Sequence, residues 1–197
     1  MNNNINLTKS KIALLFISLF ATNTYAGTDI VADGGFEGGF PNADWTPTST
    51  FTGLNGFPFC GADNSCPVPP ADVGTGNWVI WIGGLAGVTS SVEQTITIPA
   101  SAGELSLTIL RGICDDIGDV LHISIDATDI GTLPCDDTDA TPVLHSFPTT
   151  GFNDDGSHLL KIEGSFPGTN GAHSNFFIDD VTIDNSVPVE LMNYSVE

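Results

Sequence analysis

The sequence predicts an all-β protein, an antiparallel two-sheet β-sandwich of the jelly-roll type, from three features. Apolar and polar residues alternate over many short segments, which is the period-2 pattern of half-buried strands. Gly, Pro, Asn and Asp separate these segments, and these residues favour tight turns. Beyond the N-terminal apolar segment, no stretch of useful length has helical periodicity. We therefore expect roughly eight to ten short strands packed in two layers.

The N-terminal segment has the composition of a cleaved secretory signal peptide. Lys9 and Lys11 precede an apolar core at Ile12–Phe20, and small and polar residues follow at Thr24–Ala26. The apolar core is shorter than the roughly 20 residues that cross a bilayer. We therefore expect a secreted, extracellular protein of bacterial export, without membrane insertion. The chain divides into a signal peptide, one jelly-roll β-sandwich domain and an extended C-terminal tail: residues 1–26, 27–185 and 186–197.

The chain is strongly acidic, with 24 Asp and Glu residues against four Lys and Arg. Loss of the signal peptide would leave two basic residues, Arg111 and Lys161, against all 24 acids, and hence a formal charge of about −22. Such a charge repels phosphate backbones and anionic lipid, so nucleic acid is excluded as a partner. We expect most carboxylates to keep the surface solvated and a few to bind a divalent cation.

Four cysteines lie in the part of the chain that would be exported, where disulfides persist. Of the three possible pairings we favour Cys60 with Cys66, which closes a Pro-rich loop, and Cys114 with Cys135, which joins two strand ends. A zinc site is the weaker alternative, because no Cys-x-x-Cys spacing is present and no His stands nearby in a zinc pattern.

The clearest strand is Asn175–Ile183, which is rich in β-branched and aromatic residues and contains no Gly or Pro. Alternation along it places Phe177, Asp179, Val181 and Ile183 on one face. Asp179 therefore lies among apolar neighbours, where a carboxyl group needs a proton, a basic partner or a metal ion. Because so few basic residues remain, a cation is the favoured partner.

A second strand, Asn77–Gly84, carries Trp78 and Trp81, which point to opposite faces because they are three residues apart. One ring is expected in the core and the other partly exposed, where a sugar ring could stack. A first short strand is expected at Thr28–Ala32, and a long irregular loop at Phe51–Gly76. Further half-buried strands alternate in the same way: Val92–Ile98, Leu105–Ile109, Leu121–Ile125, Val143–Phe147 and Leu159–Phe166.

Five short motifs follow one another along the chain: Gly34-Gly35-Phe36-Glu37, Trp45, Gly76-Asn77-Trp78-Val79, Ser91–Thr95 and Phe177-Ile178-Asp179-Asp180-Val181. In their order and spacing the chain resembles the calcium-bearing carbohydrate-binding modules and related secreted domains of the galactose-binding-like jelly-roll superfamily. The resemblance covers about Thr28 to Asp184. It bears on the fold more than on the function, because one fold hosts many functions.

The resemblance implies a structural calcium ion that joins the glycine-rich loop to the last strand. By this resemblance Glu37 and Asp179 supply carboxylates and Gly35 a backbone carbonyl. The segment before the Gly76–Val79 motif supplies a further acid and a carbonyl in such modules. Here Thr75 stands where that acid is expected, so Trp78 would offer its carbonyl, and Asp72 could substitute for the acid.

The same resemblance implies a sugar site built on aromatic residues of an exposed, concave sheet face. The strand Glu104–Arg111 carries Ser106, Thr108 and Leu110 there instead. A stacking platform could therefore come only from Trp78 or Trp81. Four polar residues could be its partners: Asn77, Arg111, His122 and Asp126.

Three classes of function compete at this point. The first is a non-catalytic domain that binds a glycan or a cell-surface polysaccharide. The second is a structural or adhesive extracellular protein that self-associates through calcium and its acidic surface. The third, a hydrolase, is disfavoured because no Gly-x-Ser-x-Gly, His-Glu-x-x-His or Cys/His nucleophile pattern occurs in the sequence. We therefore expect no enzyme.

Overall fold

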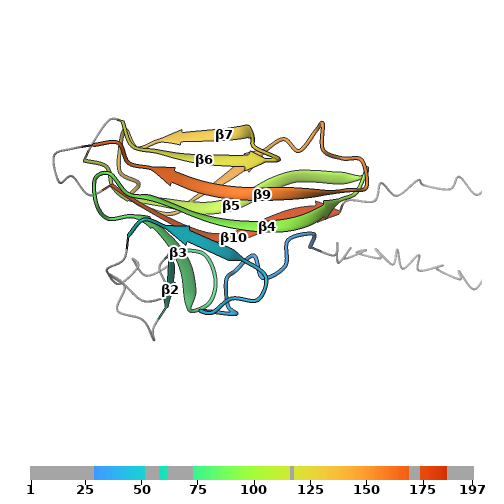
Figure 1. Ribbon diagram of the computed structural model, residues 1–197, viewed down its shortest axis with the longest axis horizontal. Helices are drawn as coiled ribbons and strands as arrows, with labels where there is room; N and C mark the ends of the chain where they lie inside the picture. Colours follow the sequence, from blue (N-terminus) through green and yellow to red (C-terminus); the bar gives the residue numbers. More distant parts are fainter. Residues whose placement is uncertain (1–28, 52–57, 62–72, 116–117, 169–173, 186–197) are drawn as a thin grey trace, which may run out of the picture.

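The computed structural model describes residues 29–51, 58–61, 73–115, 118–168 and 174–185 (Figure 1). The predicted signal peptide and the predicted tail lie outside the described residues. Within the described residues the chain forms ten β-strands and no helix. Accordingly, this part of the chain contains no helix that is long and apolar enough to cross a membrane.

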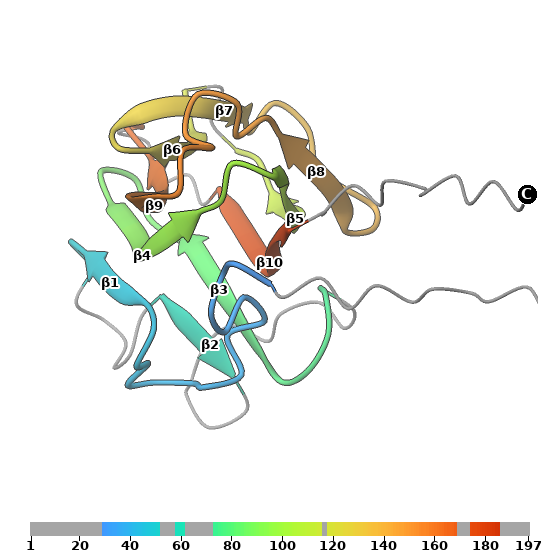
Figure 2. The same cartoon turned by 90° about the vertical axis from the view of Figure 1, so that its right-hand side faces the viewer.

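The strands form two antiparallel sheets of five strands each, which lie face to face (Figure 2). The first sheet has the order β1 (Thr46–Ser49), β4 (Thr89–Ile98), β9 (Gly156–Ser165), β6 (Val120–Ile125) and β7 (Thr128–Pro134). The second has the order β2 (Phe59–Gly61), β3 (Trp78–Gly83), β10 (Asn175–Asn185), β5 (Ala102–Ile113) and β8 (Val143–Phe147). The orders β4-β9-β6-β7 and β3-β10-β5-β8 are those of a jelly roll, which confirms the predicted fold. β1 and β2 each extend one edge.

The main core fills the space between the sheets, as the alternation of the sequence predicts. In β6, Leu121, Ile123 and Ile125 are fully buried, whereas His122 and Ser124 face outward. Burying each such aliphatic side chain contributes about 1.5–3 kcal/mol to stability. A second, smaller apolar cluster is built on the second sheet: Cys60, Val73, Val79, Trp81, Leu110 and Phe177.

A β-bulge interrupts β10 at Asp180. Asp179 lies opposite Thr108 of β5 and Thr182 lies opposite Ser106, so three steps along β10 match two along β5. Asp180 is the extra residue and has a left-handed backbone conformation, with φ of 49°. The regular alternation of side chains therefore fails at this point.

The bulge corrects the face predicted for Asp179. Four residues face the main core, two before the bulge and two after it: Phe176, Ile178, Val181 and Ile183. Phe177 instead belongs to the second cluster, on the other face of the sheet. Asp179 follows Phe177 by two residues and precedes the bulge, so it shares a face with Phe177 and not with Val181 and Ile183. It is nevertheless buried, because the segment before β3 covers that face.

Two other expectations about the N-terminal half need correction. The expected long loop Phe51–Gly76 contains the short strand β2. No regular strand forms in the described part of Thr28–Ala32, because this segment meets β10 through only isolated backbone hydrogen bonds. The Ile30 amide donates to the Ile183 carbonyl at 3.3 Å. β3 pairs with the first residues of β10, so the N-terminal segment continues that edge beyond the bulge.

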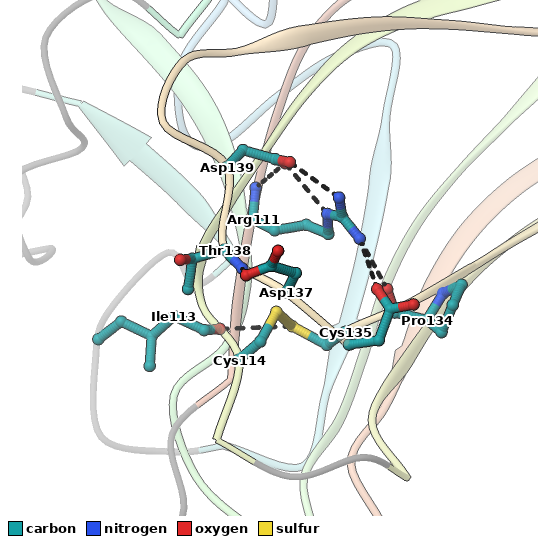
Figure 3. Close-up of polar contacts among 9 residues, drawn as sticks. Arg111, Ile113, Cys114, Pro134, Cys135, Asp137, Thr138 and Asp139 are labelled. Carbon is teal, nitrogen blue, oxygen red and sulfur yellow. Dashed lines mark hydrogen bonds and ion pairs between the residues drawn. A yellow bond between two sulfur atoms is a disulfide. The ribbon is translucent and has the colours of Figure 1, made fainter.

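A disulfide joins the two sheets at one end of the sandwich. Cys114 follows β5 and Cys135 follows β7, and their sulfur atoms are bonded, as predicted (Figure 3). Cys60 is also disulfide-bonded, and its predicted partner, Cys66, lies outside the described residues. No free cysteine occurs among the residues that the structure describes.

Candidate functional site

The first candidate site lies where the glycine-rich N-terminal segment, the segment before β3 and the bulge of β10 meet. The Glu37 carboxylate binds the segment before β3, because its Oε1 accepts hydrogen bonds from the backbone amides of Asn77 at 2.7 Å and Trp78 at 2.9 Å. The Thr75 hydroxyl donates to Asp180 Oδ1 at 2.7 Å. These hydrogen bonds link residues that are far apart in the sequence.

Asp179 is the buried acid of this site, with 1% of its surface exposed. Its Oδ1 accepts a hydrogen bond from the Asp180 amide at 2.7 Å, whereas its Oδ2 is buried without a hydrogen-bond partner in the described structure. Burial raises the pKa of Asp179 to about 7, and the nearby carboxylates of Asp180 and Glu37 add to the rise. A cation beside Oδ2 would give this oxygen a partner and would offset the cost of burying the ionised carboxylate.

Glycines let the backbone approach both carboxylates. A Cβ atom placed on Gly74, whose φ is +70°, would lie 2.2 Å from Asp179 Oδ2. One placed on Gly76, whose φ is +105°, would lie 2.2 Å from Glu37 Oε1. A side chain at either position would strain the backbone and displace the carboxylate, so these glycines allow the loop to pass close to the two acids.

The residues of this site fit a calcium ion better than a transition metal. Calcium takes oxygen ligands from carboxylates and backbone carbonyls. In the described part of the chain, no three His, Cys, Asp or Glu side chains form a metal-binding group, so carbonyls would have to complete the set. The residues predicted as metal ligands do come from the segments that meet here: Gly35, Glu37, Thr75, Trp78 and Asp179. Asp72, the substitute ligand, lies outside the described residues.

The two tryptophans point to opposite faces of β3, as predicted, but neither is a free stacking platform. Trp81 is 6% exposed, belongs to the second cluster and donates its indole N–H to Asn175 Oδ1 at 2.6 Å. Trp81 is thus a structural residue, which corrects its assignment to the sugar site. Trp78 is half-buried, and Gly39 and Gly61 lie against its indole ring.

Arg111 is held within the protein, although we expected it to bind a sugar (Figure 3). Its guanidinium donates to Asp139 at 3.1 and 2.8 Å and to Asp136 at 2.8 Å. Hydrogen bonding to Asp139 raises the pKa of Arg111, although burial opposes it. Burial acts to raise the pKa of Asp139, but hydrogen bonds from Arg111 hold it below its usual value. This ion pair lies beside the Cys114–Cys135 disulfide and reinforces the same junction of the two sheets.

Asn77, another predicted sugar ligand, directly precedes β3 of the second sheet, and its backbone amide donates to Glu37. The last two predicted ligands, His122 and Asp126, belong to the first sheet and have partners of their own. His122 Nδ1 lies 2.8 Å from Asp129 Oδ2. Asp126 Oδ2 lies 2.7 Å from His158 Nδ1, and the hydrogen bond from His158 lowers the pKa of Asp126. The six predicted residues are thus distributed over both sheets, and the structure does not gather them into one site.

The second candidate site is a groove beside β1 and β4 that we did not predict. Its cavity volume is about 570 Å³. Its lining combines hydroxyl, carboxylate and apolar groups: Thr46, Thr95 and Thr97; Asp44 and Glu93; Ile30, Ala32, Ala43, Ile96 and Leu159; and the amide of Gln94. β1 pairs with β4 only from Ser90 to Glu93, so the following residues of β4 have no partner in β1.

We did not predict the groove from the sequence, because we expected the sugar site to be built on aromatic rings. The alternation of β4 does show that Thr95 and Thr97 face outward. The sequence does not show that β1 is short, nor that residues 30–44 form the opposite wall. The Gln94 side chain fixes that wall, because it exchanges hydrogen bonds with the backbone of Ala32 at 2.9 and 2.8 Å.

No protein-family model matches the chain, and no curated protein sequence matches it either. Among solved structures, a cleaved adhesin domain of Lys-gingipain from Porphyromonas gingivalis is similar with a TM-score of 0.52 and 13% identity, over 78% of this chain and 96% of that chain. TmCBM61, solved in complex with beta-1,4-galactotriose, gives a TM-score of 0.48 and 13% identity, over 79% and 97% of the two chains. A family 11 carbohydrate-binding module of a Clostridium thermocellum cellulase gives 0.44 and 8%, over 83% and 98%.

Similarity at these identities concerns the fold alone. It agrees with the predicted fold, an antiparallel two-sheet β-sandwich of the jelly-roll type. It assigns no ligand to this chain.

Proposed function

We propose that this chain is an exported, non-catalytic glycan-binding domain whose fold is stabilised by one calcium ion. The observation that supports glycan binding is the groove on the first sheet. It is concave, is not filled by other described side chains, and mixes apolar with hydrogen-bonding groups, as ligand sites do.

The chemistry of the groove suits a chain of sugar rings. The hydroxyls of Thr46, Thr95 and Thr97 can each donate and accept hydrogen bonds, as sugar hydroxyls do. The apolar side chains of Ile30 and Leu159 offer contact to the C–H face of a ring, and Leu159 is 38% exposed. These groups bind and orient without cleaving, in agreement with the absence of hydrolase motifs from the sequence.

The calcium ion would have a structural role. Asp179 and Glu37 would hold it with backbone carbonyls of the Gly35 and Trp78 segments. It would connect the N-terminal segment, the segment before β3 and β10. The unpartnered Asp179 Oδ2 and the glycines that surround it support this assignment. None of the residues proposed to hold calcium lines the groove, so calcium would stabilise the domain and would not bind the glycan.

Binding can be tested on a panel of immobilised neutral, amine-bearing and acidic polysaccharides. We expect the wild type to be retained on at least one of them. The double variant Thr95→Val, Thr97→Val removes two groove hydroxyls at nearly constant volume and should lose most of this retention. Thr128→Val, an exposed substitution on β7 outside the groove, should keep it. Retention by the double variant equal to that of the wild type would contradict the groove as the site.

A structural or adhesive role is the second candidate, and the exposed edge of the second sheet favours it. Leu144 of β8 is 67% exposed and Val143 is 40% exposed, which is unusual for large aliphatic side chains on an acidic surface. Light scattering with and without calcium tests self-association directly. A monomer at all concentrations would exclude the adhesive role. If the protein self-associates and binds no glycan of the panel, the adhesive role would replace glycan binding as the proposed function.

A further inference from the structure

The lining of the groove beside β1 and β4 includes negatively charged side chains. Asp44 and Glu93 are the charged side chains in its lining. Neither carboxylate has a hydrogen bond or an ion pair in the described structure. Several other acids of the chain do have partners, as when Asp139 binds Arg111 or Asp129 binds His122. The groove therefore presents two carboxylates to its ligand.

The two acids come from neighbouring segments that face the same cavity. Glu93 lies on β4 directly opposite Thr46 of β1, and Asp44 precedes Thr46 by two residues. Thr95 and Thr97 continue the same outward face of β4 beyond Glu93. A ligand in the groove would thus meet two carboxylates with hydroxyl groups beside them.

No basic residue lines the groove. Lys161 of β9 lies opposite Glu93 in the first sheet, but its ammonium group binds Glu163 at 2.5 Å and Lys161 does not line the groove. Arg111, the basic residue of the second sheet, is bound to Asp136 and Asp139. With a formal charge of −20 for the whole chain, the field around the groove is negative as well.

We propose that the groove selects glycans that carry protonated amino groups, such as oligosaccharides of unacetylated amino sugars. This inference rests on the proposed glycan-binding function and adds the charge of the ligand. An ammonium group donates up to three hydrogen bonds and would complement Asp44 and Glu93, while the ring hydroxyls would meet the threonines. Uronic acid and sulfated glycans would be repelled, and neutral glycans would leave both carboxylates without a charged partner.

The test compares three β-1,4-linked oligosaccharides of equal length that differ only at C2. Glucosamine oligomers carry an amine there, N-acetylglucosamine oligomers an acetamide and glucose oligomers a hydroxyl. Calorimetry in mildly acidic buffer, where the amine is protonated, should show that the glucosamine oligomer binds about fivefold tighter than the other two, the size expected of two partly exposed ion pairs. Added salt should reduce this preference, because it screens exposed charges.

Charge-neutral variants separate the groove from general attraction to an acidic protein. Glu93→Gln and Asp44→Asn should each lower the preference for the glucosamine oligomer, and together should nearly abolish it. Glu104→Gln removes the same charge at an exposed position of β5 outside the groove and should leave the preference intact. Thermal melting of each variant checks that the fold is kept.

Each possible result either supports or overturns the proposal that the groove selects amine-bearing glycans. Loss of the preference in the groove variants but not in Glu104→Gln supports the proposal. Equal affinity of the three oligomers, or an equal loss in Glu104→Gln, overturns the selection of amines and leaves glycan binding standing. Failure of the wild type to bind these oligomers and every glycan of the panel would overturn the function as well.

Discussion

The Asp179 site predicts that calcium stabilises the protein only where the carboxyl group is ionised. Without calcium, burial raises the pKa of Asp179 from 3.8 to about 7. A raised carboxyl pKa favours folding below the unfolded-state pKa, and this contribution is lost as the pH rises through the folded-state pKa. The calcium-free protein should therefore lose stability between about pH 4 and pH 7. Calcium, which binds the carboxylate, should restore stability above that range.

The size of both effects follows from the structure. At about 1.36 kcal/mol for each pH unit between 3.8 and about 7, ionisation of the buried group costs on the order of 4 kcal/mol. A calcium concentration about a hundredfold above the dissociation constant returns roughly 2.7 kcal/mol. For a domain of this size, that corresponds to a rise of about 5–10 °C in Tm. At about pH 5 the proton occupies the site, and the rise should almost vanish.

Thermal melting of wild type and Asp179→Asn, in calcium and in chelator, measures these effects. Asp179→Asn removes the ionisable group, so its Tm should be indifferent to calcium. In chelator at about pH 8 it should be more stable than the wild type by up to about 4 kcal/mol. Asp184→Asn changes the charge of the same strand at an exposed position and should respond to calcium like the wild type. A calcium effect of equal size at both pH values, or one retained by Asp179→Asn, would refute the reasoning.

Three further predictions concern the ends of the sandwich. Replacing Cys114 and Cys135 by Ala should lower the free energy of unfolding, measured by denaturant titration, by about 3 kcal/mol, because the disulfide closes a loop of 21 residues. Peptide mapping of the wild type without reductant should recover the disulfide-linked peptides. Arg111→Lys should lower the free energy of unfolding by about 1–3 kcal/mol, since Lys cannot reproduce the two bonds to Asp139, and an unchanged midpoint would contradict the ion pair. His158 binds a carboxylate at each ring nitrogen, and these hydrogen bonds raise its pKa. The stabilising effect of His158 should therefore be complete below about pH 6.5 and lost at higher pH. NMR titration should show the raised pKa, and His158→Gln should remove this pH dependence of stability.

Much of the fold was predictable because strand periodicity is a local property. The segment Val143–Phe147 is a strand with the predicted bounds, and Leu121–Ile125 lies within a strand one residue longer. The bulge at Asp180 was not predictable, because it depends on how β10 pairs with β5 and not on the residues of β10 alone. The prediction for Asp179 was therefore right about burial and wrong about the face.

The candidate sites show the same limit. The segments expected to hold calcium do meet, because Glu37 and Asp179 each lie in a segment with a recognisable motif. The expected sugar site does not form as predicted, since Trp81 is covered by other residues of its cluster and Arg111 finds acidic partners beyond β7. Periodicity shows which way a side chain points on a strand. It does not show which loop will cover that side chain or which partner it will meet.

The most direct test of the central claim, glycan binding in the groove, is a hydrogen-exchange map of the wild-type chain with and without a glycan that it retains. The account predicts that saturating glycan slows amide exchange at Asp44–Thr46 and Thr95–Thr97, and leaves the exchange of β5 and β8 unchanged. Protection centred on the exposed face of the second sheet, around Ser106 and Thr108, or no change in either region, would contradict the account.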